Sequence, residues 1–261
     1  MSEDRQVDMK IDPARAKSLI AALQGVSERI THAAQGRTVR LVAVSKLKPA
    51  SDILALYEGA TKQEHFGENY AQELLEKAEL LPREIKWHFI GGLQSNKCKA
   101  LTSQIPNLFC VSSVDSAKKA TQLDKGRAEL LLTHPEITSP LHIHIQINTS
   151  GEASKSGIAP GPDALSLAQH IINSCPHLKL VGLMTIGDIG RSHAVGKGEE
   201  NEDFRRLVEE RERLEKELGM DLELSMGMSE DFEAAVRMGS GEVRVGSTIF
   251  GARPPKNEAR V

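Results

Sequence analysis

Aromatic residues, cysteines and long apolar runs are all scarce in this sequence, and each shortage excludes a class of protein. Aromatic residues make up 3% of the chain, with one tryptophan and two tyrosines, which argues against a stacking platform for single-stranded nucleic acid. The three cysteines, Cys98, Cys110 and Cys175, form no close pair, so neither a disulfide framework nor a zinc knuckle is expected. No apolar run approaches the roughly 20 residues that cross a bilayer.

Neither sign of charge dominates the composition. The 33 basic residues nearly balance the 36 acidic ones and leave a net charge of -3, so attraction to nucleic acid or to an anionic membrane is not expected. The first residues, Met1 to Gln6, lack the basic and then apolar order of a signal peptide. The widely spaced cysteines suit a reducing compartment. We therefore expect a cytoplasmic protein, with a mitochondrial fraction left open.

The 261 residues fit either two modest domains or one large domain. No repeat, low-complexity tract or Pro/Gly linker divides the chain, so we predict a single domain over residues 1–261. Short apolar runs typical of strands alternate with amphipathic segments typical of helices. The predicted strands are Val39–Ser45, Glu64–Gly67, Ile85–Ile90, Leu108–Val111, Leu141–Asn148, Leu178–Ile186, Leu222–Met226 and Glu242–Val245. The predicted helices between them are Ala50–Glu58, Tyr70–Leu80, Ser95–Gln104, Ser116–Leu131, Pro162–Asn173, Glu202–Leu218 and Asp231–Met238.

Strict alternation of strands and helices implies a parallel sheet, because parallel neighbours need a crossover connection. Eight such units match a (β/α)8 TIM barrel over about residues 39–250, followed by a short C-terminal tail. A doubly wound open sheet is the second alternative. An extra helix over about residues 12–35 precedes the barrel, since Asp12 can cap it and Pro13 takes its first position.

In a TIM barrel the reactive groups come from the C-terminal ends of the strands. Lys46 lies at the end of the first predicted strand, where partial desolvation lowers the pKa of an amine and prepares it to attack an aldehyde. A lysine that snorkels to the surface is the alternative. Lys48 is the competing amine, but it abuts Pro49 beyond the strand and is expected to be solvated.

Small and hydroxyl residues follow the seventh and eighth strands, in Ser225–Ser229 and Arg244–Thr248. Loops seven and eight form the usual phosphate site of a TIM barrel, and such residues let backbone N–H groups approach an anion. Arg244 is either part of a structural salt bridge or a donor aimed at a ligand. Asn69 and His88, near the ends of the second and third strands, could also bind a ligand, although Asn69 could simply cap a helix.

Two further patterns suggest chemistry but are given other interpretations. Gly190–Gly198 resembles a phosphate-binding loop, but its glycine spacing is wrong and no Ser or Thr follows its lysine, so a plain loop is expected. His142 and His144 share one face of a strand without a third candidate ligand, which favours a polar layer over a metal site. We therefore expect no bound metal.

A candidate Schiff-base lysine on strand one and a candidate phosphate site after strands seven and eight together suggest pyridoxal 5'-phosphate (PLP) on a barrel. Six strings lie in order along the site-forming strands: Ala43–Lys46, Phe66–Tyr70, His88–Gly91, Leu183–Ile186, Leu224–Ser229 and Val243–Gly246. With these strings the chain resembles the YggS/PROSC family of pyridoxal phosphate homeostasis proteins, which is related to the N-terminal barrel of alanine racemase. The tail Gly251–Arg260 is most similar to fungal members.

The resemblance implies a role for particular residues. Lys46 would form the Schiff base with PLP, and Arg244 would face the pyridine nitrogen. Asn69 and Met184 would line the ring. The phosphate would be held by Ser229, Gly246, Ser247 and Thr248, a set called the phosphate cup below. No residue is assigned a catalytic role.

The implied function is PLP binding in intracellular PLP homeostasis, with buffering and delivery of the cofactor and little or no turnover. The partners implied are PLP itself and PLP-requiring apo-enzymes, and the chain is expected to be a monomer. The alternatives are a PLP-dependent amino-acid racemase of low activity and an aldolase that uses Lys46 as its Schiff-base amine. The resembled racemases supply a second acid–base group from a separate C-terminal β-domain, for which no room is expected here. The loop Gly187–Asn201 has no role that the sequence indicates.

Overall fold

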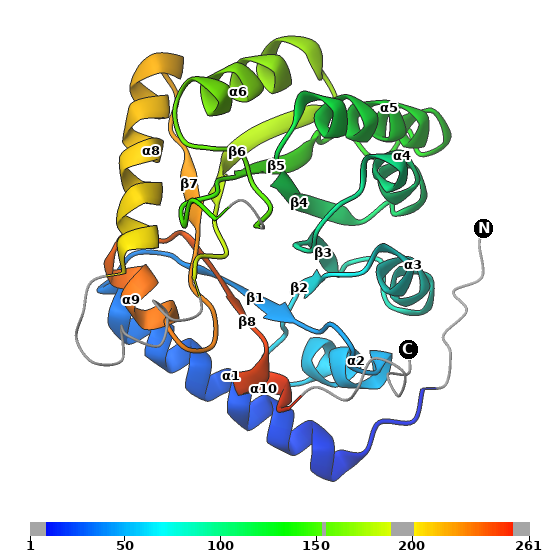
Figure 1. The fold of residues 1–261 in the computed structure, drawn as a ribbon. Helices are drawn as coiled ribbons and strands as arrows, with labels where there is room; N and C mark the ends of the chain where they lie inside the picture. The colour runs from blue at the N-terminus through cyan, green and yellow to red at the C-terminus, as the bar shows by residue number, and fades with distance from the viewer. Residues whose placement is uncertain (1–8, 153–154, 189–200, 253–261) are drawn as a thin grey trace.

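A closed barrel of eight parallel strands forms the centre of the computed structural model, which describes residues 9–152, 155–188 and 201–252 (Figure 1). The strands pair in chain order, and β8 returns to β1 with Val42 opposite Arg244. The predicted (β/α)8 barrel is therefore confirmed. The strands are β1 (Arg40–Val44), β2 (His65–Glu68), β3 (Lys86–Phe89), β4 (Leu108–Val114), β5 (Leu141–Gln146), β6 (Leu178–Met184), β7 (Glu223–Ser225) and β8 (Glu242–Val245).

Helices surround the barrel, as Figure 1 shows. Their bounds are α1 (Pro13–Ala34), α2 (Ala50–Glu58), α3 (Ala71–Leu80), α4 (Ser95–Gln104), α5 (Ala117–Thr133), α6 (Pro162–Ser174), α8 (Glu202–Leu218), α9 (Phe232–Arg237) and α10 (Ser247–Phe250). The short α10 was not predicted, because four residues are too few to show a helical period. The segment Gly190–Gly198, predicted to be a plain loop, lies outside the described residues.

The extra N-terminal helix is confirmed as α1. The Asp12 side chain accepts a hydrogen bond from the Ala14 amide at 2.9 Å, and Pro13 opens the helix, so the predicted cap forms. A buried apolar stripe holds the helix against the barrel layer: Leu19, Leu23, Val26 and Ile30. Arg15 adds a bidentate ion pair to Asp52 of α2 and a hydrogen bond to the Phe250 carbonyl of α10.

The inside of the barrel is polar toward the N-terminal ends of the strands. Arg40 Nη1 lies 3.0 Å from both the Glu223 and the Glu242 carboxylates, and His144 Nε2 lies 2.8 Å from Glu223. Burial alone would raise the pKa of Glu242, but the neighbouring His88, His144 and Arg40 hold that pKa well below its ordinary value. His144 also contacts the Ser112 hydroxyl at 3.0 Å, so the polar layer expected around the strand-five histidines is present.

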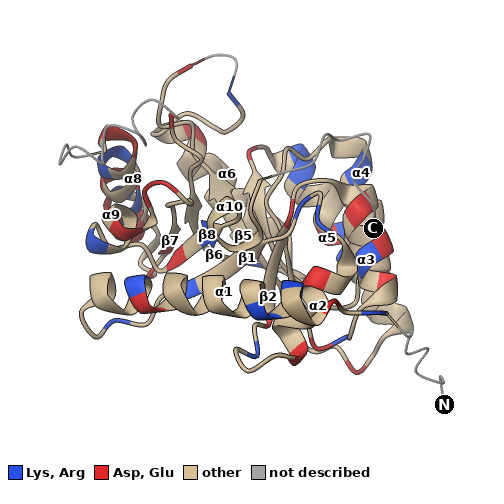
Figure 2. Ribbon diagram, turned by 90° about the horizontal axis from the view of Figure 1, so that it is seen from below, with Lys and Arg blue, Asp and Glu red and all other residues tan. Residues whose placement is uncertain are grey.

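Charged residues lie mainly on the helices, and the strands carry few of them (Figure 2). On α8, basic and acidic residues stand side by side, and Glu202 pairs with both Arg205 and Arg206. Among the helices that the structure describes, none combines the length and the apolar character needed to span a membrane.

Candidate functional site

Lys46 lies in the turn that connects the end of β1 to α2, at the C-terminal end of the barrel. The other predicted site residues come to the same end, because every strand of a closed parallel barrel points the same way. Asn69 follows β2, Met184 is the last residue of β6, and Arg244 belongs to β8. The four residues of the phosphate cup follow β7 and β8. This is the end at which TIM barrels carry their active sites.

The prediction that Lys48 is solvated is wrong. Lys48 is only 7% exposed, and its ammonium group donates a hydrogen bond to the Ala252 carbonyl, which follows α10. The sequence pattern suggested solvent because Lys48 stands beyond the strand. The chain returning from β8 through α10 covers it instead. Lys46 is partly exposed by comparison.

Arg244 is buried, with 4% of its surface exposed, and it makes no salt bridge among the described residues. Its Nη1 donates to the Ser225 hydroxyl at 2.7 Å, and its Nη2 donates to the Thr185 carbonyl at 2.7 Å. Burial lowers the pKa of the guanidinium, while the nearby Glu242 and Asp231 carboxylates oppose that change. A guanidinium held by two hydrogen bonds in this way is a rigid donor. This is what the prediction that Arg244 donates to a ligand requires.

The phosphate cup is formed by two turns that meet. The Ser229 hydroxyl, after β7, accepts hydrogen bonds from the Gly246 amide at 3.3 Å and the Thr248 amide at 3.5 Å. Ser247 and Thr248 are exposed at this end of the barrel. Gly246 packs closely against β1, because a Cβ atom there would lie 3.2 Å from the Val44 carbonyl oxygen, a tight contact. The two turns therefore bring hydroxyl and backbone N–H groups together at this end of the barrel, with the Gly246 and Thr248 amides donating to Ser229.

Asn69 does not cap a helix. The N-cap of α3 is Tyr70, and it makes no capping hydrogen bond through its side chain. The Asn69 Oδ1 atom is buried and accepts no hydrogen bond from any residue that the structure describes. A buried acceptor without a partner is costly, so this amide is better suited to a bound ligand than to the fold alone. Met184 is fully buried at the end of β6, where it offers an apolar surface.

His88 is part of the polar layer inside the barrel, toward the N-terminal ends of the strands. Its Nε2 lies 2.8 Å from Nδ1 of His65, the first residue of β2, and its Nδ1 lies 3.5 Å from Glu242. Its ring also contacts Phe109, near the start of β4. The expectation that His88 could bind a ligand therefore receives no support from its position. Among the described residues, no group of three or more His, Cys, Asp or Glu side chains could hold a metal ion.

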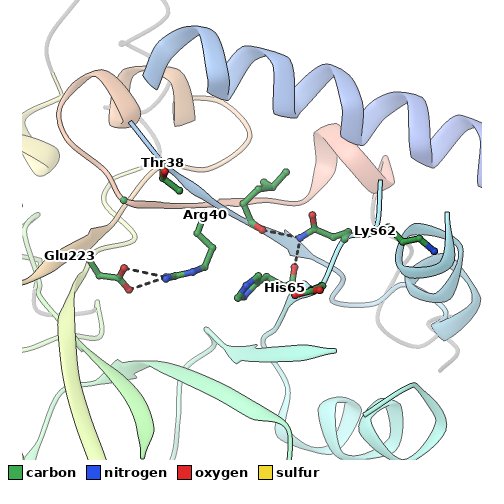
Figure 3. A pocket seen from close by; sticks show the side chains of 9 residues that line it. Thr38, Arg40, Lys62, His65 and Glu223 are labelled. Atoms are coloured by element: carbon green, nitrogen blue, oxygen red, sulfur yellow. Dashed lines mark hydrogen bonds and ion pairs between the residues drawn. The ribbon is translucent and has the colours of Figure 1, made fainter. Parts of the chain in front are cut away.

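A second group of functional-looking residues lies at the opposite, N-terminal end of the barrel. Thr38, Arg40, Lys62, His65 and Glu223 line a pocket there, and the Arg40 guanidinium points at the Glu223 carboxylate (Figure 3). Burial lowers the pKa of His65 to about 4. Because the Arg40 guanidinium is already paired with the Glu223 and Glu242 carboxylates, it is not available to a ligand here, and we assign this pocket none.

One set of buried charges was not predicted from the sequence. Lys77 of α3 is completely buried and pairs with Glu68 at 2.7 Å and Glu73 at 2.6 Å, directly beside the turn of Lys46. Burial raises the pKa of Glu68 to about 7. The sequence did contain one indication of this pairing: Glu73 and Lys77 are four residues apart, on one face of a helix.

Comparison with known proteins identifies the family. A model of the family described as alanine racemase, N-terminal domain, matches residues 20–254. The pyridoxal phosphate homeostasis protein of Schizosaccharomyces pombe is 44% identical over 241 residues, which cover 92% of this chain and 95% of that protein. The chain belongs to the pyridoxal phosphate homeostasis protein family. The family predicted from the strand-end motifs, with its fungal members, is thereby confirmed.

Other members of the pyridoxal phosphate homeostasis protein family agree with this assignment. The human protein of that name is 45% identical over 253 residues, covering 89% of this chain and 86% of the human one. The structure of PipY from Synechococcus elongatus with PLP bound matches with a TM-score of 0.71 at 30% identity. That match covers 89% of this chain and 100% of PipY.

Proposed function

We propose that this protein binds PLP through a Schiff base to Lys46 and serves PLP homeostasis by buffering and delivering the cofactor, with little or no turnover. One observation carries the proposal. The turn of Lys46, the fixed fork of Arg244 and the hydroxyl of Ser229 all lie at the C-terminal end of one barrel. The relatives named for PLP homeostasis, and PipY with its bound PLP, support it.

The residues fit the parts of PLP in turn. Ser229, Gly246, Ser247 and Thr248 hold the phosphate with hydroxyl and backbone N–H donors. Arg244 donates to the pyridine nitrogen, while Asn69 and Met184 line the ring. The amine of Lys46 would hold the aldehyde end of the cofactor covalently.

Bound PLP would supply an electrophilic carbon and an electron sink. Arg244 limits the strength of that sink, because a guanidinium keeps its protons and offers the ring nitrogen a hydrogen bond rather than a proton. Chemistry that needs a strong sink is therefore disfavoured, which suits a carrier.

The decisive experiment is the visible spectrum of the purified protein after incubation with PLP. A yellow band that borohydride abolishes is expected in the wild type and in Lys48→Ala, but not in Lys46→Ala. Mass spectrometry after reduction should find the cofactor on the peptide that contains Lys46. A band lost in Lys48→Ala but kept in Lys46→Ala would reject the assignment. A colourless wild-type protein would favour the aldolase alternative.

Two further points concern the oligomeric state of the protein and the enzymes that receive PLP from it. We propose that the protein is a monomer and passes PLP directly to apo-enzymes that require it. Light scattering should give the mass of a single chain, 28.5 kDa. An apo-aminotransferase should regain activity from the holo-protein even when free PLP is trapped by a scavenger. A dimer mass, or recovery that the scavenger blocks, would contradict these two points.

We also propose a location in the cytoplasm, with a mitochondrial fraction. The three cysteines are free and buried, as suits a reducing compartment. Fractionation of cells that express a tagged protein tests this, and recovery only from a secreted fraction would contradict it.

A further inference from the structure

The backbone on both sides of Lys46 is held by one pair of charged side chains from α3. The Lys77 ammonium donates a hydrogen bond to the carbonyl of Ser45 at 2.9 Å. The amide of Leu47 donates to Glu73 Oε1 at 2.7 Å. Since Lys77 and Glu73 also pair with each other at 2.6 Å, the two contacts form one connected unit around the turn.

A buried ammonium is an expensive way to hold two elements together. Lys77 is 0% exposed, and removing its charge from water is compensated only because three acceptors surround it. The third acceptor is Glu68 Oε1, which also accepts from the Ser45 hydroxyl at 2.7 Å. An apolar side chain would be buried at this position with a smaller desolvation penalty. Stability alone therefore does not account for a lysine here, whereas its contacts with the turn of Lys46 do.

The turn itself adopts a conformation that needs support. Leu47 has a φ of 60°, in the left-handed region that a residue with a Cβ atom disfavours. In the part of the chain that the structure describes, the other non-glycine residues with positive φ are Gln35 and Lys62, and neither lies at the C-terminal end of the barrel. Such a conformation persists only where the surroundings hold it, and here the Glu73 carboxylate does so.

We propose that Glu73 and Lys77 are positioning residues that clamp the turn and thereby aim the Lys46 amine at the aldehyde of bound PLP. The inference rests on the proposed function of Lys46. The Ser45 carbonyl is fixed on one side and the Leu47 amide on the other, so the Cα atom of Lys46 is held between two anchored peptide groups. A pre-organised amine reacts without first ordering its backbone, so the clamp strengthens PLP binding and slows its release.

Two substitutions of Glu73 separate the hydrogen bond from general stability. Glu73→Gln keeps an oxygen that can accept from the Leu47 amide, whereas Glu73→Ala removes it. Glu79→Ala is the matched control, because Glu79 is an exposed glutamate of the same helix. Glu73→Ala should bind PLP roughly tenfold more weakly, Glu73→Gln should lose less, and the control should match the wild type.

A readout without cofactor tests the clamp directly. In the apo-protein, the Leu47 amide should be protected from hydrogen exchange in the wild type and in Glu79→Ala, and it should exchange faster in Glu73→Ala. Adding Leu47→Gly to Glu73→Ala should recover part of the lost PLP affinity, because glycine adopts positive φ without the Cβ penalty. A substitution that merely loosened α3 would not be rescued by a glycine in the turn.

Lys77 is tested with a paired change, since Lys77→Met alone leaves the buried Glu68 without its cation. The double variant Glu68→Gln/Lys77→Met removes the fully buried pair, leaves the 12% exposed Glu73 carboxylate to accept from the Leu47 amide alone, and should also weaken PLP binding several-fold. Unchanged Leu47 exchange or unchanged PLP affinity in Glu73→Ala would overturn the clamp, as would failure of the glycine rescue. If the wild type forms no Schiff base at Lys46, the proposed function fails instead, while the exchange result still reports on the clamp.

Discussion

Arg244 Nη1 donates a hydrogen bond to the Ser225 hydroxyl at 2.7 Å, and that hydroxyl donates in turn to Glu242 Oε1 at 2.7 Å. One serine therefore connects the arginine proposed to face the cofactor ring with the acidic layer inside the barrel. Because its own proton is directed to Glu242, the hydroxyl presents a lone pair to Arg244. This orients the guanidinium, and the nearby carboxylate helps it to stay charged against the effect of burial.

Removing this serine should weaken both the fold and the cofactor site. Ser225→Ala leaves two buried charged groups without their shared partner, which should lower the free energy of unfolding by about 1–3 kcal/mol. PLP affinity should fall as well, since Arg244 loses one of its two fixed contacts. Urea unfolding and equilibrium PLP titration measure the two effects.

Ser113→Ala is the matched control for that prediction. Ser113 is also a buried serine of a barrel strand, but its hydroxyl has no hydrogen-bond partner among the described residues. Its removal should be neutral or slightly stabilising. Equal losses in the two variants would mean that any buried hydroxyl matters equally, and the link between Arg244 and Glu242 would lose its support.

The phosphate cup should distinguish PLP from pyridoxal. Ser229→Ala and Ser247→Ala should each weaken PLP binding by roughly 1.5–3 kcal/mol, because a hydrogen bond to a charged group is lost. Pyridoxal lacks the phosphate and should bind about equally well to the wild type and both variants. Fluorescence titration with the two ligands makes the comparison. A large loss for pyridoxal too would show that these serines act elsewhere or hold the fold.

The hydrogen-bonded pair of His65 and His88 should make the protein less stable in mild acid. Burial lowers the pKa of His88 to about 3 and that of His65 to about 4, and the hydrogen bond between the rings needs one unprotonated nitrogen. Both rings are therefore neutral when folded, while the unfolded chain protonates them below about pH 6.5. The unfolded state then binds more protons, so the free energy of unfolding falls as the pH decreases from about 6.5 toward 4.

Urea unfolding at several pH values between about 7 and 5 measures this slope in the wild type, in His88→Gln and in His32→Gln, an exposed histidine of α1. The His88 variant should show a flatter dependence, although it is less stable at neutral pH. Glu68, with its raised pKa, contributes the opposite slope, but it is common to all three proteins and cancels in the difference. Parallel curves for the wild type and His88→Gln would refute the assignment of this slope to the buried pair.

The barrel and most of the strand ends were predictable because they depend on local patterns. Alternating strand and helix periods imply parallel crossovers, and the C-terminal strand ends then gather Lys46, Asn69 and Arg244 at one end without any knowledge of their contacts. The four-residue α10 leaves no periodic signal, which is why it was missed.

The positions of Lys48 and Lys77 depend on distant parts of the chain and could not be predicted in this way. Lys48 is covered by Ala252, about 200 residues away in sequence, as the hydrogen bond between them shows. Lys77 lies on the buried face of α3. From the sequence alone a lysine is expected on the solvent-exposed face of a helix. Its burial becomes understandable only once the carbonyl of Ser45 and the carboxylates of Glu68 and Glu73 are seen around it.

The protein is expected not to sustain amino-acid racemisation, because a two-base mechanism needs an acid–base group on each face of the substrate carbanion. Lys46 is the candidate for one face. The sequence contains two tyrosines that could serve the other. Tyr57 lies within α2, where it packs against the hydrophobic core. Tyr70, 38% exposed, precedes α3 and follows Asn69, so it is the tyrosine placed near the cofactor end.

Incubating the PLP-loaded protein with L-alanine or L-serine and following the D-isomer by chiral chromatography tests this expectation. No turnover above that of free PLP is expected in the wild type, in Tyr70→Phe or in Tyr57→Phe. Turnover of about 1–10³ s⁻¹ in the wild type would overturn the carrier function in favour of a racemase. If Tyr70→Phe abolished that turnover and Tyr57→Phe did not, Tyr70 would be identified as the second acid–base group, since each substitution removes only a phenol oxygen.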